Sequence, residues 1–274
     1  MHAVLGIDAA WTQGQPSGVA LIADDSAGWR QIRLAPSYEA FVACCTGSEV
    51  DWIAPPTAGF CDASALLAAA AHVLGDAEIV VVAVDMPMAI TSIAGRRAAD
   101  QETSRAFGRY GCGVHSPSHI RPGLVTQTLH SGFSRHGFSL ATLAPRARTT
   151  PALVEVYPHA ALLRLLDIDD RLPYKISKST KYWRGATTTE RRENLLHQLA
   201  RIQGALALEI RDVELRLPSS SAVASFEQLK RYEDTLDALV CAWVGSRYLA
   251  GDIVPYGDET AAIWVPPRRP SLTA

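Results

Sequence analysis

The sequence predicts one α/β domain that spans all 274 residues, and three observations predict it. Two apolar segments, residues 3–8 and 18–24, flank a turn rich in Gly, Pro and polar residues, as in an antiparallel hairpin. Residues 78–85 (EIVVVAVD) are a continuous apolar run, typical of a strand buried on both faces. Helical patterns alternate with strands in the rest of the chain, so the predicted order is β-β-β-α-β-α-β-α.

Each element is predicted from its own pattern. Residues 62–75 begin with Asp, continue with Ala and Leu, and end with Gly, which are helix start and stop signals. A helix that opens at Thr188 or Thr189 has capping-box residues, and a long helix at 224–249 has apolar residues at helical spacing. The other predicted elements are a strand at 29–34, a helix at 38–45, a helix at 96–110, a loop at 111–123, a strand at 152–157 and a helix at 159–166.

Composition limits the class of protein. Apolar residues make up 48% of the chain and charged residues 20%, as is ordinary for a soluble globular protein. No apolar run reaches eighteen residues and no signal-peptide pattern is visible, so we expect no membrane partner and a cytoplasmic location. The five cysteines contain no C-x-x-C pair, which argues against a disulfide framework or a thiolate zinc site.

The charges are unevenly distributed. A net charge of −2 argues against a general nucleic-acid binder. Residues 96–148, however, carry eight arginines against two acids, and residues 171–201 carry eight basic residues against two acids. The two segments form an anion-facing side if they meet in the fold, and are ordinary solvated faces if they do not. Both interpretations stay open.

Two aspartates, Asp8 and Asp85, end apolar strands. If these strands are neighbours in the sheet, the two carboxylates lie close together, which is unfavourable unless a cation lies between them. Ligand sets made only of oxygen favour Mg²⁺ or Mn²⁺ over zinc. The alternative is that each aspartate only begins a turn.

Further acids lie on the later elements. Asp234 and Asp237 are three residues apart and therefore share one face of the long helix, which is either the sheet-facing side or a solvated one. Glu155 lies inside an apolar strand and requires a partner, which is a metal site or one of the arginines.

Several short motifs resemble a known superfamily. The segments G-I-D-A-A and G-V-A-L-I, the strand end V-D-M-P and the late D-x-x-D helix resemble the ribonuclease H-like superfamily, particularly its resolvase branch. More closely, V-D-M-P, R-R-A-A-D, E-V-Y-P-H-A and E-D-T-L-D-A-L resemble DUF429, a family described as predicted nucleases of the ribonuclease H fold. The resemblance spans nearly the whole chain.

The resemblance implies a mixed five-stranded sheet with an antiparallel first pair and helices on both faces. It makes Asp8, Asp85 and Asp237 the metal-holding residues, with Asp234 and Glu155 as further members of the catalytic set. Two departures are visible. The acid that the superfamily carries on its first crossover helix has no counterpart, since Asp62 lies too early, and residues 96–148 form a basic helical and loop insertion that shapes the substrate site.

The expected activity is two-metal hydrolysis of nucleic acid or of a nucleotide-like phosphate ester, with Asp8 bridging two Mg²⁺ or Mn²⁺ ions. The residues expected to hold the substrate are Arg97, Arg105 and Arg192, which suit bidentate phosphate contacts, and Tyr157, Tyr174 and Lys175, which line the cleft. The four histidines of the insertion are His115, His119, His130 and His136. Their spacing matches no standard zinc site, and an acid–base role for His115 is the better alternative.

Two other functions stay open. A catalytically silent nucleic-acid-binding module on the same fold would bind without metal and with strong salt dependence. An ATP-dependent phosphotransferase would need a Gly-rich phosphate loop, for which T-Q-G-Q-P-S is a weak match, and a second similar domain, for which the chain is too short.

Overall fold

The computed structural model describes residues 1–144 and 151–268, which are organised around one mixed sheet. Within these residues the sheet has eight strands, in the order β3-β2-β1-β4-β6-β8-β7, with β5 also paired to β6. The strands are β1 (His2–Asp8), β2 (Gly18–Asp25), β3 (Gly28–Ala35), β4 (Glu78–Asp85), β5 (Ser139–Leu140), β6 (Ala152–Val156), β7 (Val254–Gly257) and β8 (Ala262–Val265).

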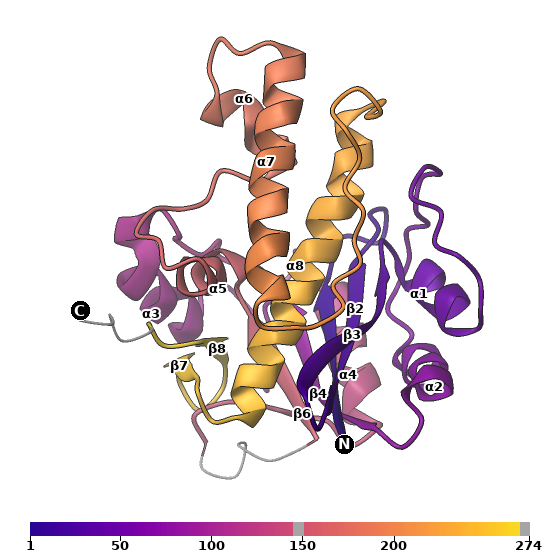
Figure 1. Cartoon of the computed structure of the whole chain (residues 1–274). Coiled ribbons are helices and arrows are strands. Elements are labelled where there is room, and N and C mark those ends of the chain that lie inside the picture. Colours follow the sequence, from indigo (N-terminus) through magenta and orange to yellow (C-terminus); the bar gives the residue numbers. More distant parts are fainter. Residues whose placement is uncertain (145–150, 269–274) are drawn as a thin grey trace, which may run out of the picture.

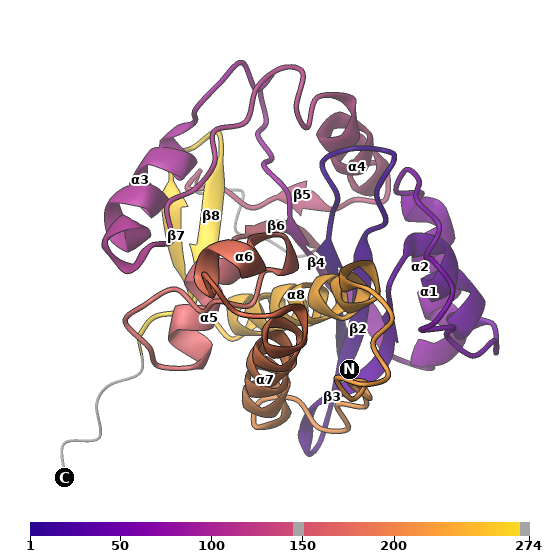
Figure 2. The same ribbon diagram turned by 90° about the horizontal axis from the view of Figure 1, so that it is seen from above.

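Helices cover both faces of this sheet. They are α1 (Tyr38–Cys45), α2 (Ala63–Leu74), α3 (Ala98–Phe107), α4 (Leu124–Ser134), α5 (Pro158–Leu165), α6 (Ser179–Tyr182), α7 (Thr188–Ala207) and α8 (Phe226–Leu249), with short 3₁₀ turns η1 (Gly108–Tyr110) and η2 (Ile176–Lys178). Helices α5, α7 and α8 share one hydrophobic core with the sheet, and α1, α2 and α4 share another on the opposite face (Figures 1 and 2). No described helix is long and apolar enough to cross a membrane.

The five predicted strands are adjacent in the sheet, in the order β3-β2-β1-β4-β6. Strand β1 runs antiparallel to β2 and parallel to β4, as the resemblance implied. The predicted count of five strands was too low, because β8 pairs in parallel with β6 and β7 adds an antiparallel strand beyond it. Both extra strands have only four residues, and β5 has two, which is too short for a period-two pattern to emerge.

Most predicted helices are confirmed with their caps. The Asp62 side chain accepts a hydrogen bond from Ala65 N at 3.1 Å at the start of α2, and Thr187 and Glu190 form the capping box of α7. The predicted insertion at 96–148 contains α3, η1, α4 and β5. Its residues 145–148, with Arg146 and Arg148, lie outside the described residues.

Helix α8 lies directly on the backbone of the central strands. A Cβ atom on Gly6 would overlap the carbonyl oxygen of Ala238 and lie 2.6 Å from Ala242 N. A Cβ on Gly245 would likewise lie 2.5 Å from Val4 Cγ1. Only glycine fits these contacts, so the glycines allow the helix to approach the sheet closely. This approach brings the acids of α8 to the strand ends.

Candidate functional site

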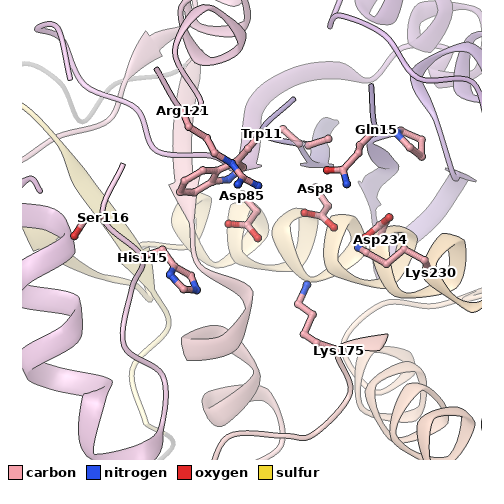
Figure 3. A pocket seen from close by; sticks show the side chains of 13 residues that line it. Asp8, Trp11, Gln15, Asp85, His115, Ser116, Arg121, Lys175, Lys230 and Asp234 are labelled. Carbon is pink, nitrogen blue, oxygen red and sulfur yellow. Dashed lines mark hydrogen bonds and ion pairs between the residues drawn. The ribbon is translucent and has the colours of Figure 1, made fainter. Parts of the chain in front are cut away.

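Asp8 and Asp85 are register partners at the carboxyl ends of the parallel strands β1 and β4. Side chains alternate between the faces of a strand, and Val81 and Ala83 belong to the core on the α8 side. Asp85 therefore faces α8, as does Asp8, two residues after Gly6. Figure 3 shows the two carboxylates side by side in front of α8. The predicted pairing of the two aspartates is confirmed.

Neither carboxylate of this pair has a hydrogen bond or an ion pair to another described residue. Both line a cavity of about 590 Å³, the acidic cavity, whose other side chains include Trp11, Gln15, His115, Arg121, Lys175, Lys230 and Asp234. Burial and the negative charge of Asp8 raise the pKa of Asp85 well above its ordinary value. Two adjacent carboxylates without partners require a proton or a cation between them.

The acids of α8 differ from this pair because lysines neutralise them. Asp237 accepts hydrogen bonds from Tyr174 Oη at 2.8 Å and from Lys175 Nζ. Asp234 pairs with Lys230. Burial raises the pKa of Asp237 to about 6, with Lys175 opposing the rise, and burial together with Asp8 raises the pKa of Asp234 well above its ordinary value.

Glu233 is a central residue that the sequence analysis missed. Its carboxylate lies 3.1 Å from both Lys175 Nζ and Lys230 Nζ, and it accepts a hydrogen bond from Ile176 N at 2.6 Å. Although burial opposes it, the two lysines lower the pKa of Glu233 below its ordinary value. The spacing in the sequence could have indicated that Glu233 is buried. Glu233 and Asp237 are four residues apart, at positions that continue the apolar stripe of α8.

Glu155 is held by a structural ion pair. Val154 and Val156 of β6 belong to the core on the α8 side. Because side chains alternate along a strand, Glu155 between them faces away from α8. Arg97 contacts both of its oxygens at 2.6 Å, and Met88 N donates to it at 2.8 Å. Arg97 also pairs with Asp100, so its guanidinium is already occupied within the protein. The alternative of an arginine partner for Glu155 is confirmed.

The remaining predicted residues are dispersed. Arg105 is exposed on α3, and Arg192 on α7 donates to Ala224 O at 3.1 Å, so neither lines the acidic cavity. Tyr157 Oη donates to Gly113 O at 3.0 Å. Among the histidines only His115 lines the acidic cavity, while His119 and His130 line another and His136 contacts Ser64.

The donors fit a divalent ion held by two carboxylates. Among the described residues no three His, Cys, Asp or Glu side chains converge as a ready-made metal site. Asp8 and Asp85 nevertheless offer free carboxylate oxygens, and Mg²⁺ is commonly held by one or two carboxylates with water and substrate oxygens. Five carboxylates against two lysines and one arginine leave this region with excess negative charge: Asp8, Asp85, Glu233, Asp234, Asp237, Lys175, Lys230 and Arg121.

His159 gives the folded protein a measurable pH dependence. It is buried between the rings of Tyr157 and Tyr174, and Arg171 contacts its Nε2. Burial and the nearby cations hold its pKa well below 6.5. Below about pH 6.5 His159 is therefore protonated in the unfolded chain but neutral in the folded chain. The free energy of unfolding then decreases as pH falls, by up to about 1.4 kcal/mol per pH unit.

Urea unfolding of the wild type and of His159→Gln from pH 5 to 7.5 checks this prediction. The acids with raised pKa values affect both proteins alike, so the difference between the two curves isolates the histidine. We expect the variant to gain stability relative to the wild type as pH falls below 6.5. Parallel curves would contradict the prediction.

Comparison with known proteins gives one match. A family model described as "Protein of unknown function (DUF429)" matches residues 6–261, which is nearly the whole chain. No curated protein and no solved structure matches the chain significantly. The matched range contains Asp8, Asp85 and the acids of α8.

Proposed function

Because the chain belongs to the DUF429 family, whose function is unknown, we propose a function from its own site: metal-dependent hydrolysis of phosphodiesters, with nucleic acid as the substrate class. The observation that carries the proposal is the in-register pair of Asp8 and Asp85, whose carboxylates have no partner within residues 1–144 and 151–268, in a cavity of about 590 Å³. The strand order β3-β2-β1-β4-β6 with acids at these two strand ends supports assignment to the ribonuclease H-like fold. Fold likeness alone does not specify a reaction, so the proposal rests on the site.

Asp8 and Asp85 would hold one Mg²⁺ or Mn²⁺ ion. When bound, such an ion would supply Lewis-acid polarisation of a phosphoryl oxygen and activation of a water nucleophile. Arg121 lines the same cavity and has no ion pair to the described residues, so its guanidinium would attract the anionic substrate. His115, from the loop before α4, would supply a proton to the leaving oxygen.

We propose one ion rather than two. A second ion would need further carboxylates, but Lys175 already binds Asp237 and Glu233, and Lys230 binds Asp234. These ammonium groups place positive charge next to Asp8 and Asp85. They would therefore supply part of the charge stabilisation that a second ion supplies in two-metal enzymes.

The proposal is tested by a metal-dependence assay on the full chain. Single-stranded DNA, RNA and a simple aryl phosphodiester are incubated with excess Mg²⁺, Mn²⁺ or EDTA, and Mn²⁺ binding is titrated by electron paramagnetic resonance. We expect hydrolysis with either ion, none in EDTA, and Mn²⁺ affinity at least tenfold weaker in Asp85→Asn. Equal Mn²⁺ affinity in both proteins, with no metal-dependent cleavage of any substrate, would overturn it.

A second candidate is a nucleic-acid-binding module without catalysis. The pairing of the α8 acids with lysines favours it, because only two carboxylates of the described residues are left free at the cavity. Such a module would bind nucleic acid equally well in EDTA and in Mg²⁺, and its affinity would fall steeply with salt. Loss of cleavage with unchanged binding in Asp85→Asn would exclude this candidate.

A further inference from the structure

A second cavity of about 280 Å³ lies beside the acidic cavity, and we call it the basic cavity. The two share several lining residues: Trp11, Asp85, His115, Lys175 and Lys230. Figure 3 shows His115 near Asp85 and Lys175 reaching toward the two aspartates. A ligand group in the basic cavity would therefore lie next to a group held at Asp8 and Asp85.

Two cations of the basic cavity have no acidic partner among the described residues. Arg171 donates to Gly111 O at 3.3 Å and contacts His159, and its Nε is buried without a partner. Lys178 lines the cavity and has no ion pair within residues 1–144 and 151–268. The cavity wall also contains three acids. Arg97 neutralises Glu155, Lys175 and Lys230 of the same wall neutralise Glu233, and Asp85 has no ion pair to the described residues.

The charges of this cavity are therefore unbalanced. Burial lowers the pKa of Lys178, and the repulsion of Arg171 and Lys175 lowers it further. The same cations disfavour protonation of His159, whose Nδ1 is a buried atom without a hydrogen-bond partner in the described part of the chain. Like charges held together in a partly buried cavity are unfavourable, and a bound anion would relieve the repulsion.

We propose that the basic cavity binds a second phosphate group of the substrate, adjacent to the phosphate held at Asp8 and Asp85. The inference rests on the proposed function and names its substrate class, which is a molecule with at least two phosphate groups, such as a nucleic-acid strand. Arginine suits bidentate phosphate contacts, and Lys178 supplies a second positive charge. Trp11, which lines both cavities, offers a ring on which a base between the two phosphates can stack.

Binding of thymidine 3′,5′-bisphosphate and of thymidine 5′-monophosphate, measured by calorimetry in excess Mg²⁺ at fixed ionic strength, tests this proposal without catalysis, because neither probe contains a phosphodiester bond. We expect the wild type to bind the bisphosphate at least tenfold more tightly. Lys178→Gln and Arg171→Gln should each reduce that preference by about tenfold. Lys178 is half-exposed, and its side chain has no hydrogen bond or ion pair to the described residues, so Lys178→Gln keeps the test valid if Arg171→Gln fails to fold. The matched control is Arg216→Gln, which removes an exposed charge from the loop between α7 and α8.

The outcomes separate this inference from the proposed function. Equal affinity for the two probes, unchanged in Lys178→Gln, would overturn the second phosphate site even if the wild type hydrolyses nucleic acid with Mg²⁺. A bisphosphate preference that is lost in Lys178→Gln and kept in Arg216→Gln would support the site even if no hydrolysis is found. A preference lost equally in Arg216→Gln would overturn it, because the effect would then come from net charge alone.

Discussion

Replacing Asp8 with asparagine is expected to lower kcat/KM for metal-dependent hydrolysis by about 10³-fold, because the pair then lacks one of its two free carboxylates. Asp85→Asn should have a similar effect. The double variant should lose little more than either single variant, since the two carboxylates act as one unit. Steady-state kinetics on the three variants measure this non-additivity.

Asp8→Asn should at the same time stabilise the metal-free protein. Removing one of two adjacent, partly buried carboxylates relieves repulsion of about 1 kcal/mol, which raises Tm by about 2–4 °C. Asp76→Asn removes the same charge from an exposed turn and should change neither activity nor Tm. A variant Asp8→Asn that keeps wild-type activity would show that the pair is not the catalytic centre, and a lowered Tm would contradict the predicted relief of repulsion.

Replacing Gly6 with alanine should destabilise the protein by about 3–4 kcal/mol, the largest stability effect that we expect. The added Cβ would overlap the backbone oxygen of Ala238, so α8 must move off the sheet. The end of a flexible side chain can rotate away from an added Cβ, but a backbone oxygen inside a helix cannot move without the helix. Urea unfolding of the purified variant measures the loss in free energy of unfolding.

The matched control is Gly204→Ala, in the exposed part of α7. A Cβ on Gly204 meets no atom within 4 Å, and alanine is the better helix residue, so this variant should gain about 0.5–1 kcal/mol. If Gly6→Ala is insoluble while Gly204→Ala is stable, the result would agree with the expected destabilisation by Gly6→Ala. A Gly6→Ala variant within about 0.5 kcal/mol of the wild type would contradict the close approach of α8.

The central strands and the pair of aspartates were predictable because they depend on local patterns. An uninterrupted apolar run identifies β4, and its last residue marks the sheet edge at which parallel strands end together. Period-two alternation also sets the face of each side chain. The same rule places Glu155 on the face opposite Asp85, although Glu155 was predicted to be a further member of the catalytic set.

The extra strands were beyond such patterns. Strands β7 and β8 have four residues each and are stabilised by pairing with β6 and with each other. A segment of this length carries too few alternations to be distinguished from a loop. Their place in the sheet depends on a neighbour about a hundred residues earlier in the chain.

By itself, the sequence determined the α/β class, the order of the central elements and the pairing of Asp8 with Asp85, because strand and helix periodicity act between residues that are close in the chain. Only the tertiary structure decided which charges meet. The segment at Tyr174, Lys175 and Ile176 has no periodic pattern, yet it neutralises the acids of α8 about sixty residues later. Ion pairs and cavities depend on the path of the loops in space, where residue spacing along the chain no longer fixes distance.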